Sequence, residues 1–200
     1  LIQIFNLRAG GLAIYGGVIA AVITLTVYTR KKKLSFFSMA DSGCLGLITG
    51  QIIGRWGNFF NCEAFGGYTD SLFAMRIRRA LVNESMISQD LLNHLIVKDG
   101  VEYIQVHPTF LYESVWNLGV LAFMLWYRKR KKFNGEMLLI YLLGYGLGRV
   151  WIEGLRTDQL IFFNTGIAVS QALSLVLVVI SALVLIWKHR QIRLKSKGED

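Results

Sequence analysis

The sequence predicts an all-α protein, a polytopic bundle of about five transmembrane helices with a polar segment on the outer side. Composition is the first observation, since 54% of the 200 residues are hydrophobic and 18% are charged. In soluble domains about 45–50% of the residues are apolar and about 25% are charged. The charges also lie in blocks that separate apolar runs long enough to cross a bilayer core as helix, which takes about 20 residues. Finally, basic blocks follow alternate apolar runs.

The predicted spans are 10–29, 36–60, 108–127, 135–153 and 166–187. Basic blocks follow the first, third and fifth spans, at 30–33, at 128–132 and in the tail 188–200. Short loops rich in Lys and Arg stay in the cytoplasm, and alternating crossings place all three blocks on that side. We therefore expect one integral membrane domain over residues 1–200, with residues 63–106 as an extracytoplasmic segment and residues 188–200 as a cytoplasmic tail.

Charge and cysteine usage argue against other classes of protein. The net charge of +9 does not predict nucleic-acid binding, because the basic residues flank the spans and form no basic surface with stacking aromatics. Cys44 and Cys62 have neither a metal-ligand spacing nor the pattern of a disulfide framework. We expect no metal, no cofactor and no nucleic-acid partner. The basic blocks suit contacts with anionic membrane lipids.

A polar cluster stands at the outer end of the second predicted span. Arg55 follows a long apolar run, and Asn58, Asn61 and Glu63 come directly after it. An arginine at mid-bilayer costs about 2.5 kcal/mol or more, so a partner must offset that cost. An anionic ligand would do so.

A second arginine is predicted on the fourth span. Tyr145, Arg149 and Glu153 are four residues apart, and Arg156 is three residues further on, so all four share one helical face. Within hydrocarbon this face must point into the bundle or toward a water-filled cavity. The plain alternative is an Arg149–Glu153 pair that only neutralises itself. If Arg149 instead joins Arg55, two forked guanidiniums suit a phosphate.

Two further motifs lie at outer span ends. His107 precedes Pro108 at the start of the third span, where it is either a helix cap or a proton acceptor. Glu113 lies deeper in that span and needs a partner. Tyr15 lies within the glycine-rich residues 10–17, which favour close helix packing, and it is either an interfacial anchor or a polar group of the site.

Polar residues of four spans thus share one depth near the outer leaflet, whereas the inner halves hold only Asp41 and Glu136 close to the basic flanks. This predicts a binding site that faces outward. An anion-binding transporter or channel is the alternative from another class, and a purely structural membrane subunit is a third. The lack of a polar path inward and of an internal repeat speaks against a transporter.

Four sequence blocks carry a resemblance to a known family: GGLAIYGG at 10–17, GRWGNFFNCEAFG at 54–66, HPTFLYE at 107–113 and YGLGRVWIEGLRTD at 145–158. Together, and in this order, they resemble bacterial prolipoprotein diacylglyceryl transferases. The second block is the most specific, with matching positions at Arg55, Gly57, Asn58, Asn61, Glu63 and Gly66. The sequence departs from the family at Tyr15, where many members carry histidine, and at Thr157, where proline is usual.

The resemblance implies that the diacylglyceryl group of phosphatidylglycerol is transferred to the lipobox cysteine thiol of a preprolipoprotein, with release of glycerol phosphate, at the outer leaflet of the bacterial cytoplasmic membrane. It also implies that further membrane helices precede Leu1. The expected catalytic residues are His107, Tyr15, Arg149 and Glu153. The expected substrate-binding residues are Arg55, Asn58, Asn61, Glu63, Tyr145 and Arg156.

In this interpretation each group has a role. Arg55 and Arg149 bind the phosphate, and Glu153 holds an arginine in place. Asn58 and Asn61 position the head group or orient Arg55. Glu63 either holds an arginine or accepts a hydrogen bond from a glycerol hydroxyl. His107 is the leading base candidate, with Tyr15 as a polar orienting group.

Overall fold

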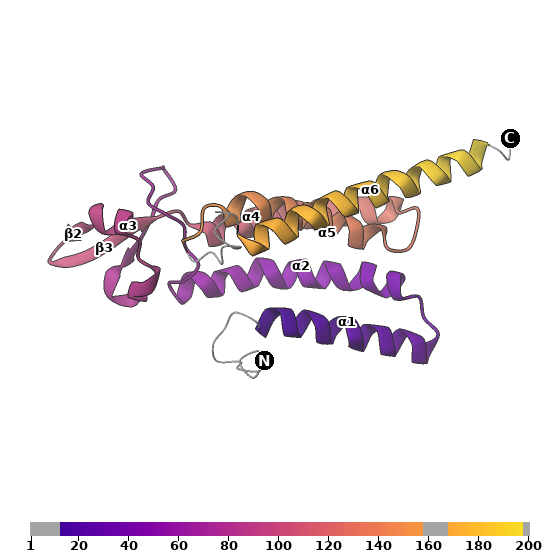
Figure 1. The fold of residues 1–200 in the computed structure, drawn as a ribbon, viewed down its shortest axis with the longest axis horizontal. Coiled ribbons are helices and arrows are strands. Elements are labelled where there is room, and N and C mark those ends of the chain that lie inside the picture. The colour runs from indigo at the N-terminus through magenta and orange to yellow at the C-terminus, as the bar shows by residue number, and fades with distance from the viewer. Residues whose placement is uncertain (1–12, 158–167, 198–200) are drawn as a thin grey trace.

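A computed structural model describes residues 13–157 and 168–197, with side chains from residue 16 to residue 196 within these ranges. Long helices run along one axis of the molecule (Figure 1). They are α1 (Ala13–Lys32), α2 (Phe36–Phe60), α4 (Thr109–Tyr127), α5 (Glu136–Glu153) and α6 (Val169–Lys197). Short 3-10 turns at Arg79–Leu81, Glu84–Met86 and Arg128–Arg130 complete the helical elements, together with α3 (Gln89–Asn93).

The helices follow the predicted spans closely, with one clear difference. Helix α2 has the predicted bounds, and α4 and α5 each begin one residue after the predicted start. Helix α6 begins at Val169 and continues to Lys197, through most of the predicted tail. The tail stays helical because Lys and Arg are good helix formers and neither glycine nor proline interrupts it before Gly198.

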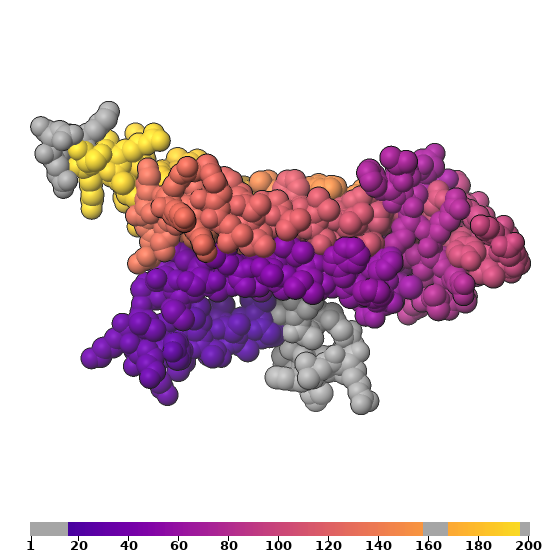
Figure 2. All heavy atoms as spheres, turned by 180° about the vertical axis from the view of Figure 1, so that it is seen from behind, coloured from indigo at the N-terminus to yellow at the C-terminus, as the bar shows by residue number. Residues whose placement is uncertain are grey.

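The core of the bundle lies between α2, α4 and α5, which run side by side along the molecule (Figures 1 and 2). Its buried members are Cys44, Ile48, Met124, Met137, Ile140 and Tyr141. Glycines let α5 approach its neighbours closely, as is common between membrane helices. A Cβ at Gly148 would meet the ring of Trp116 on α4, and one at Gly146 would meet Val178 on α6.

The two acids predicted in the inner halves of the spans are both buried and paired with other groups of the protein. Asp41 on α2 accepts hydrogen bonds from the backbone N–H groups of Gly135 (2.8 Å) and Leu138 (3.0 Å), and it pairs with Lys131 at 3.1 Å. Glu136 is fully buried. Its carboxylate accepts from the Tyr127 hydroxyl at 2.6 Å and lies 2.7 Å from Nε2 of His189.

The all-α prediction is wrong for residues 63–106, which contain a three-stranded antiparallel sheet. Its strands are β1 (Met75–Arg78), β2 (Ile96–Lys98) and β3 (Val101–Val106), in the order β1-β3-β2. Met75 pairs with Val106, and Ile96 pairs with Tyr103. The physical reason is a period of two in β1 and β3, which buries one face of each of these two strands. The buried cluster beneath the sheet is Phe65, Ile77, Val82, Leu91, Ile104 and Val106.

A hairpin signal in the sequence accounts for the β2–β3 connection. The two strands are joined by Asp99 and Gly100, whose φ angles are +52° and +75°. A two-residue Asp-Gly loop with positive φ at both positions matches the right-handed twist of paired strands.

The polarity of the molecule runs along its long axis. The sheet lies at one end, whereas the α1–α2 connection, the α4–α5 connection and the C-terminal end of α6 lie at the other (Figure 1). The basic blocks of the sequence therefore gather at the end opposite the sheet. Among the described residues, α2 and α6 are long and apolar enough to cross a bilayer by length and composition.

Candidate active site

One carboxylate joins the two arginines that the sequence singled out. Glu113 on α4 contacts Nε of Arg55 from α2 through Oε2, and it accepts a 2.5 Å hydrogen bond from Nη1 of Arg149 on α5 through Oε1. The Glu113 side chain is 4% exposed, and those of Arg55 and Arg149 are 20% and 12% exposed. Two guanidiniums from different helices thus converge on one point within the bundle.

Glu153 forms the second acidic group of the site. Its Oε2 contacts Nη2 of Arg149 and lies 3.8 Å from Nη1 of Arg156, while its Oε1 accepts a 2.6 Å bond from the hydroxyl of Ser170 at the start of α6. Arg156 lies beyond α5, which ends at Glu153, and it forms an isolated β-bridge with Gly66 rather than continuing the helix. The turn still brings Arg156 within reach of Glu153, so the pair Arg149–Glu153 does not stand alone.

A chain of amides follows Arg55. Nη1 of Arg55 donates to Oδ1 of Asn58 at 3.2 Å, and Nδ2 of Asn58 donates to Oε1 of Glu63 at 3.0 Å. The side chain of Asn61 donates to the same Glu63 oxygen at 3.2 Å. Glu63 therefore contacts the two asparagines, and the direct carboxylate partner of Arg55 is Glu113. Asn58 has the geometry that orients Arg55.

The backbone after α2 turns sharply to present Glu63. Asn61 caps the helix, and the residues on either side of Glu63, Cys62 and Ala64, have positive φ angles of 53° and 55°. The N–H of Glu63 then bonds back to the carbonyl of Asn58 at 3.0 Å. Such left-handed residues persist only when their surroundings hold them.

Two other chain segments hold this turn in place. The N–H groups of Gly66 and Gly67 donate to the carbonyls of His107 and Leu155, each at 3.0 Å, and the buried Thr109 hydroxyl donates to the carbonyl of Ala64. A Cβ at Gly66 would lie 2.7 Å from Cβ of His107 and 2.8 Å from the Leu155 carbonyl oxygen. Only glycine fits where these segments meet, which links the ends of α2, α4 and α5.

His107 lies directly before α4, and its ring does not cap that helix. Nδ1 lies 3.3 Å from the hydroxyl of Tyr112, and the helix begins after Pro108 with no side-chain cap bond. Burial lowers the pKa of His107 below its usual range, so the imidazole is neutral at pH 7. If Nδ1–H donates to the phenol oxygen, Nε2 is free to accept a proton.

The two predicted tyrosines have different surroundings. Tyr145 stacks on Tyr141 with ring centroids 5.6 Å apart, and Nε2 of Gln51 donates to the Tyr141 hydroxyl at 2.9 Å. Tyr145 therefore packs against the core of the bundle. The side chain of Tyr15 lies outside the described residues, whose backbone begins at Ala13 of α1.

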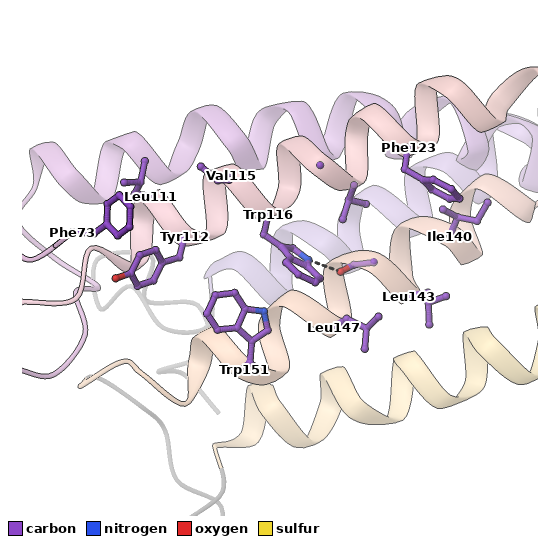
Figure 3. A pocket seen from close by; sticks show the side chains of 13 residues that line it. Phe73, Leu111, Tyr112, Val115, Trp116, Phe123, Ile140, Leu143, Leu147 and Trp151 are labelled. Carbon is purple, nitrogen blue, oxygen red and sulfur yellow. Dashed lines mark hydrogen bonds between the residues drawn. The ribbon is translucent and has the colours of Figure 1, made fainter. Parts of the chain in front are cut away.

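An apolar groove of about 640 Å³ lies between α4 and α5 and reaches Tyr112, whose hydroxyl lies 3.3 Å from Nδ1 of His107 (Figure 3). Tyr112, next to Glu113 in sequence, lines one end of the groove with Phe73, and Trp116 and Trp151 form its middle. Nε1–H of Trp116 donates a 2.8 Å hydrogen bond to the Gly144 carbonyl, so the part of the ring that lines the groove is apolar. The arrangement combines a cluster of paired arginines with a lining that suits a hydrocarbon chain.

Metal-ligating side chains do not cluster in the part of the chain whose side chains are described. Sequence reasoning noted that Glu113 needs a partner but did not place it among the site residues. It missed Thr109 and Ser170, which are small hydroxyl residues with no signal of their own. Glu113 was detectable as an acid within an apolar run, where an unpaired charge is costly.

Comparison with known proteins supplies the family. The family model described as prolipoprotein diacylglyceryl transferase matches residues 1–187. The phosphatidylglycerol–prolipoprotein diacylglyceryl transferase of Clostridioides difficile is 43% identical over 158 residues, which are 79% of this chain and 54% of the relative. Those of Clostridium botulinum and Bacillus cytotoxicus are 41% and 40% identical, over 90% and 94% of this chain and 65% of each relative.

The chain thus spans between about half and two thirds of the length of these relatives. The match extends from its first residue through most of α6, and it includes every block that surrounds the paired arginines. The chain belongs to the prolipoprotein diacylglyceryl transferase family.

Proposed function

We propose that the protein transfers the diacylglyceryl group of phosphatidylglycerol to the lipobox cysteine thiol of a preprolipoprotein and releases glycerol phosphate. The observation that carries this proposal is the convergence of Arg55 and Arg149 on one carboxylate beside an apolar groove, in a chain of this family. A phospholipid has the same two parts, an anionic head group and hydrocarbon chains.

The reaction forms a bond between sulfur and a glycerol carbon and breaks the bond from that carbon to a phosphate oxygen. Glycerol phosphate leaves with the electron pair, and a base takes the thiol proton. A free thiol has a pKa of about 8.5, so a nearby base is needed near neutral pH. Neutral His107 at the outer end of α4 is the proposed base, with Tyr112 orienting its ring and Tyr15 as a further polar group.

The arginines act on the leaving group. The phosphodiester is already charged in the ground state, so guanidiniums that only bind it improve affinity. They accelerate transfer to the extent that they hold the developing charge on the leaving oxygen more tightly. Arg55 and Arg149 supply these contacts, and Glu153 holds Arg149 in position. Asn58, Asn61 and Glu63 position the glycerol head group, and Arg156 and Tyr145 complete the binding site.

We further infer that the chain crosses the membrane five times, with its sheet outside and its basic blocks in the cytoplasm. The site then lies toward the outer leaflet, and acyl chains enter the groove between α4 and α5 from the side. The substrate peptide arrives as a membrane-tethered helix beneath the 63–106 segment. The transporter alternative has no support, because the inner acids Asp41 and Glu136 are paired within the packing and line no inward path.

The test is transfer of labelled phosphatidylglycerol to a lipobox peptide by the full-length protein in membranes. Arg55→Lys and Arg149→Lys should each lower the transfer rate by at least about tenfold, because lysine keeps the charge but loses the forked contact. Arg76→Lys is the matched control, since Arg76 is exposed on β1 and bonds to Gln105. Wild-type rates in both site variants would overturn the proposed role of the arginines.

A further inference from the structure

The carboxylate of Glu113 uses the same guanidinium donors that a phosphate would need. Nη1 and Nη2 of Arg149 contact Glu113 and Glu153, and Nε and Nη1 of Arg55 contact Glu113 and Asn58. A guanidinium binds phosphate best through two parallel N–H groups. A phosphate that binds through the same nitrogens of both arginines therefore competes with Glu113, which both of them contact.

Among the residues whose side chains are described, the charges of the site balance without a phosphate. The three positive charges are those of the arginines Arg55, Arg149 and Arg156. Two carboxylates, those of Glu113 and Glu153, contact these arginines directly. A third, that of Glu63, is connected to Arg55 through the side-chain amide of Asn58. An added phosphodiester anion leaves one negative charge in excess in a buried place, where like charges repel strongly. Moving one carboxylate away from the arginines would lower this repulsion.

Glu113 is the carboxylate with the least other support. Oε1 of Glu63 accepts bonds from Asn58 and Asn61, and Glu153 accepts one from Ser170. In the described part of the chain, Glu113 has hydrogen bonds and ion pairs with the two arginines alone. It also lies directly between the donors that face the substrate phosphate in the proposed function.

We propose that Glu113 is a built-in counter-ion, which holds Arg55 and Arg149 in register and which the phosphate of phosphatidylglycerol displaces. Glu113 is thus a positioning residue that competes with the lipid. It neutralises the two arginines within the bundle at a cost in lipid affinity, because part of the binding energy is used to displace it. This inference rests on the proposed function only for the identity of the lipid.

A Glu113 that competes with the lipid and a Glu113 that only holds the arginines predict opposite changes in lipid affinity when its charge is removed. In Glu113→Gln the competing charge is gone and the site gains one positive charge. The Kd for phosphatidylglycerol should then fall by about fivefold or more, within the usual range of coupling between ligands. KM should fall with it, and kcat should also fall, because the arginines lose the group that aligns them. If Glu113 only holds the arginines for a lipid that never displaces it, Kd and KM rise instead.

The experiment measures binding of phosphatidylglycerol by the full-length protein in neutral-lipid nanodiscs, alongside steady-state transfer. Glu102→Gln is the matched control, because this exposed acid on β3 pairs with Arg79 away from the site, and its Kd should equal that of wild type. Glu113→Asp keeps the charge on a shorter arm that reaches both arginines less well. It should lower Kd by a smaller factor, and it serves as the test if the glutamine variant does not fold.

The outcomes separate this inference from the proposed function. Tighter lipid binding in Glu113→Gln supports displacement even if the wild-type protein shows no transfer, a result that would overturn the proposed function alone. Unchanged or weaker binding in both Glu113 variants overturns displacement, even if wild-type transfer is rapid.

Discussion

Thr109 illustrates how a single buried hydroxyl controls the site. Its side chain donates to the carbonyl of Ala64, a residue with a φ of 55°, and Thr109 is only 2% exposed. Because Ala64 follows Glu63, this bond fixes the left-handed backbone that turns Glu63 toward Asn58 and Asn61. The hydroxyl therefore acts on the site through the backbone.

We expect Thr109→Val to lower the free energy of unfolding by about 1–3 kcal/mol, because the Ala64 carbonyl loses its buried partner. Transfer should slow as Glu63 loses its fixed position, whereas Thr109→Ser should retain both properties. Thermal unfolding in detergent and the transfer assay check this. Thr49→Val is the control, because it removes an exposed hydroxyl that bonds to the Leu45 carbonyl within α2. Equal losses in the two valine variants would contradict the prediction.

Gly66 and Gly67 form a natural matched pair. In Gly66→Ala the new Cβ would lie 2.8 Å from the Leu155 carbonyl oxygen and 2.7 Å from Cβ of His107, so backbone must move. We expect a loss of stability of about 1–3 kcal/mol and a loss of transfer. Gly67→Ala places its Cβ in open space, so it should behave as wild type in both assays. Similar stability and transfer in the two variants would show that position 66 is not too crowded for a Cβ.

The pH profile should report His107. Burial lowers its pKa below its usual 6.5, so the neutral form persists on acidification and is lost only as the pH falls through the lowered value. The acid limb of kcat/KM should therefore lie below pH 6.5. His107→Gln should remove this limb and reduce kcat/KM by about 10²-fold or more. His94→Gln, at the end of α3, is the control. An acid limb that persists in His107→Gln would exclude His107 as the base.

At the scale of elements, the start of α5 depends on a residue of α2. Helix N-termini leave backbone N–H groups without partners inside the helix. Here Asp41 of α2 accepts from the N–H groups of Gly135 and Leu138 and pairs with Lys131. One side chain thus caps α5, neutralises a basic residue and joins two helices at the end of the bundle opposite the sheet.

Asp41→Ala should therefore lower the free energy of unfolding by about 2 kcal/mol or more, since it removes a cap and a buried ion pair together. The measurement is thermal unfolding in detergent. Transfer per folded molecule should change little, because Asp41 lies at the end of the bundle far from Glu113. Ser42→Ala, the exposed neighbour, is the control. A melting temperature equal to that of wild type would show that the cap contributes nothing.

At the scale of the whole molecule, charge and shape agree. The sheet stands at one end of the bundle, and the basic connections stand at the other (Figure 1). The paired arginines lie toward the sheet end, where the ends of α2, α4 and α5 meet through Gly66, His107 and Leu155. A single orientation in the membrane thus satisfies both the basic blocks and the site.

Orientation can be tested with single cysteines and a membrane-impermeant maleimide. Lys98→Cys, exposed on β2, should be labelled in intact bacterial cells, whereas Lys129→Cys, in the basic connection after α4, should be labelled only after lysis. The unaltered chain gives the background from its native thiols. Labelling of Lys129→Cys in intact cells would reverse the proposed orientation.

The position of most helices and the location of the polar cluster were predictable from the sequence. Apolar length, charge blocks and the four-residue spacing of Arg149 and Glu153 are local properties, and local properties survive in any tertiary arrangement. The sheet was missed because its strands are only three to six residues long, although Asp99-Gly100 marked a hairpin.

Only the tertiary structure decided which charges pair. Glu113, Arg55 and Arg149 stand on three helices, and their contact depends on how each helix is rotated about its axis and how closely the helices approach. Spacing along one helix does not determine that rotation relative to another. The sequence therefore determined that buried arginines require counter-charges, because hydrocarbon does not solvate ions, and packing between helices selected Glu113 as the counter-charge that they share.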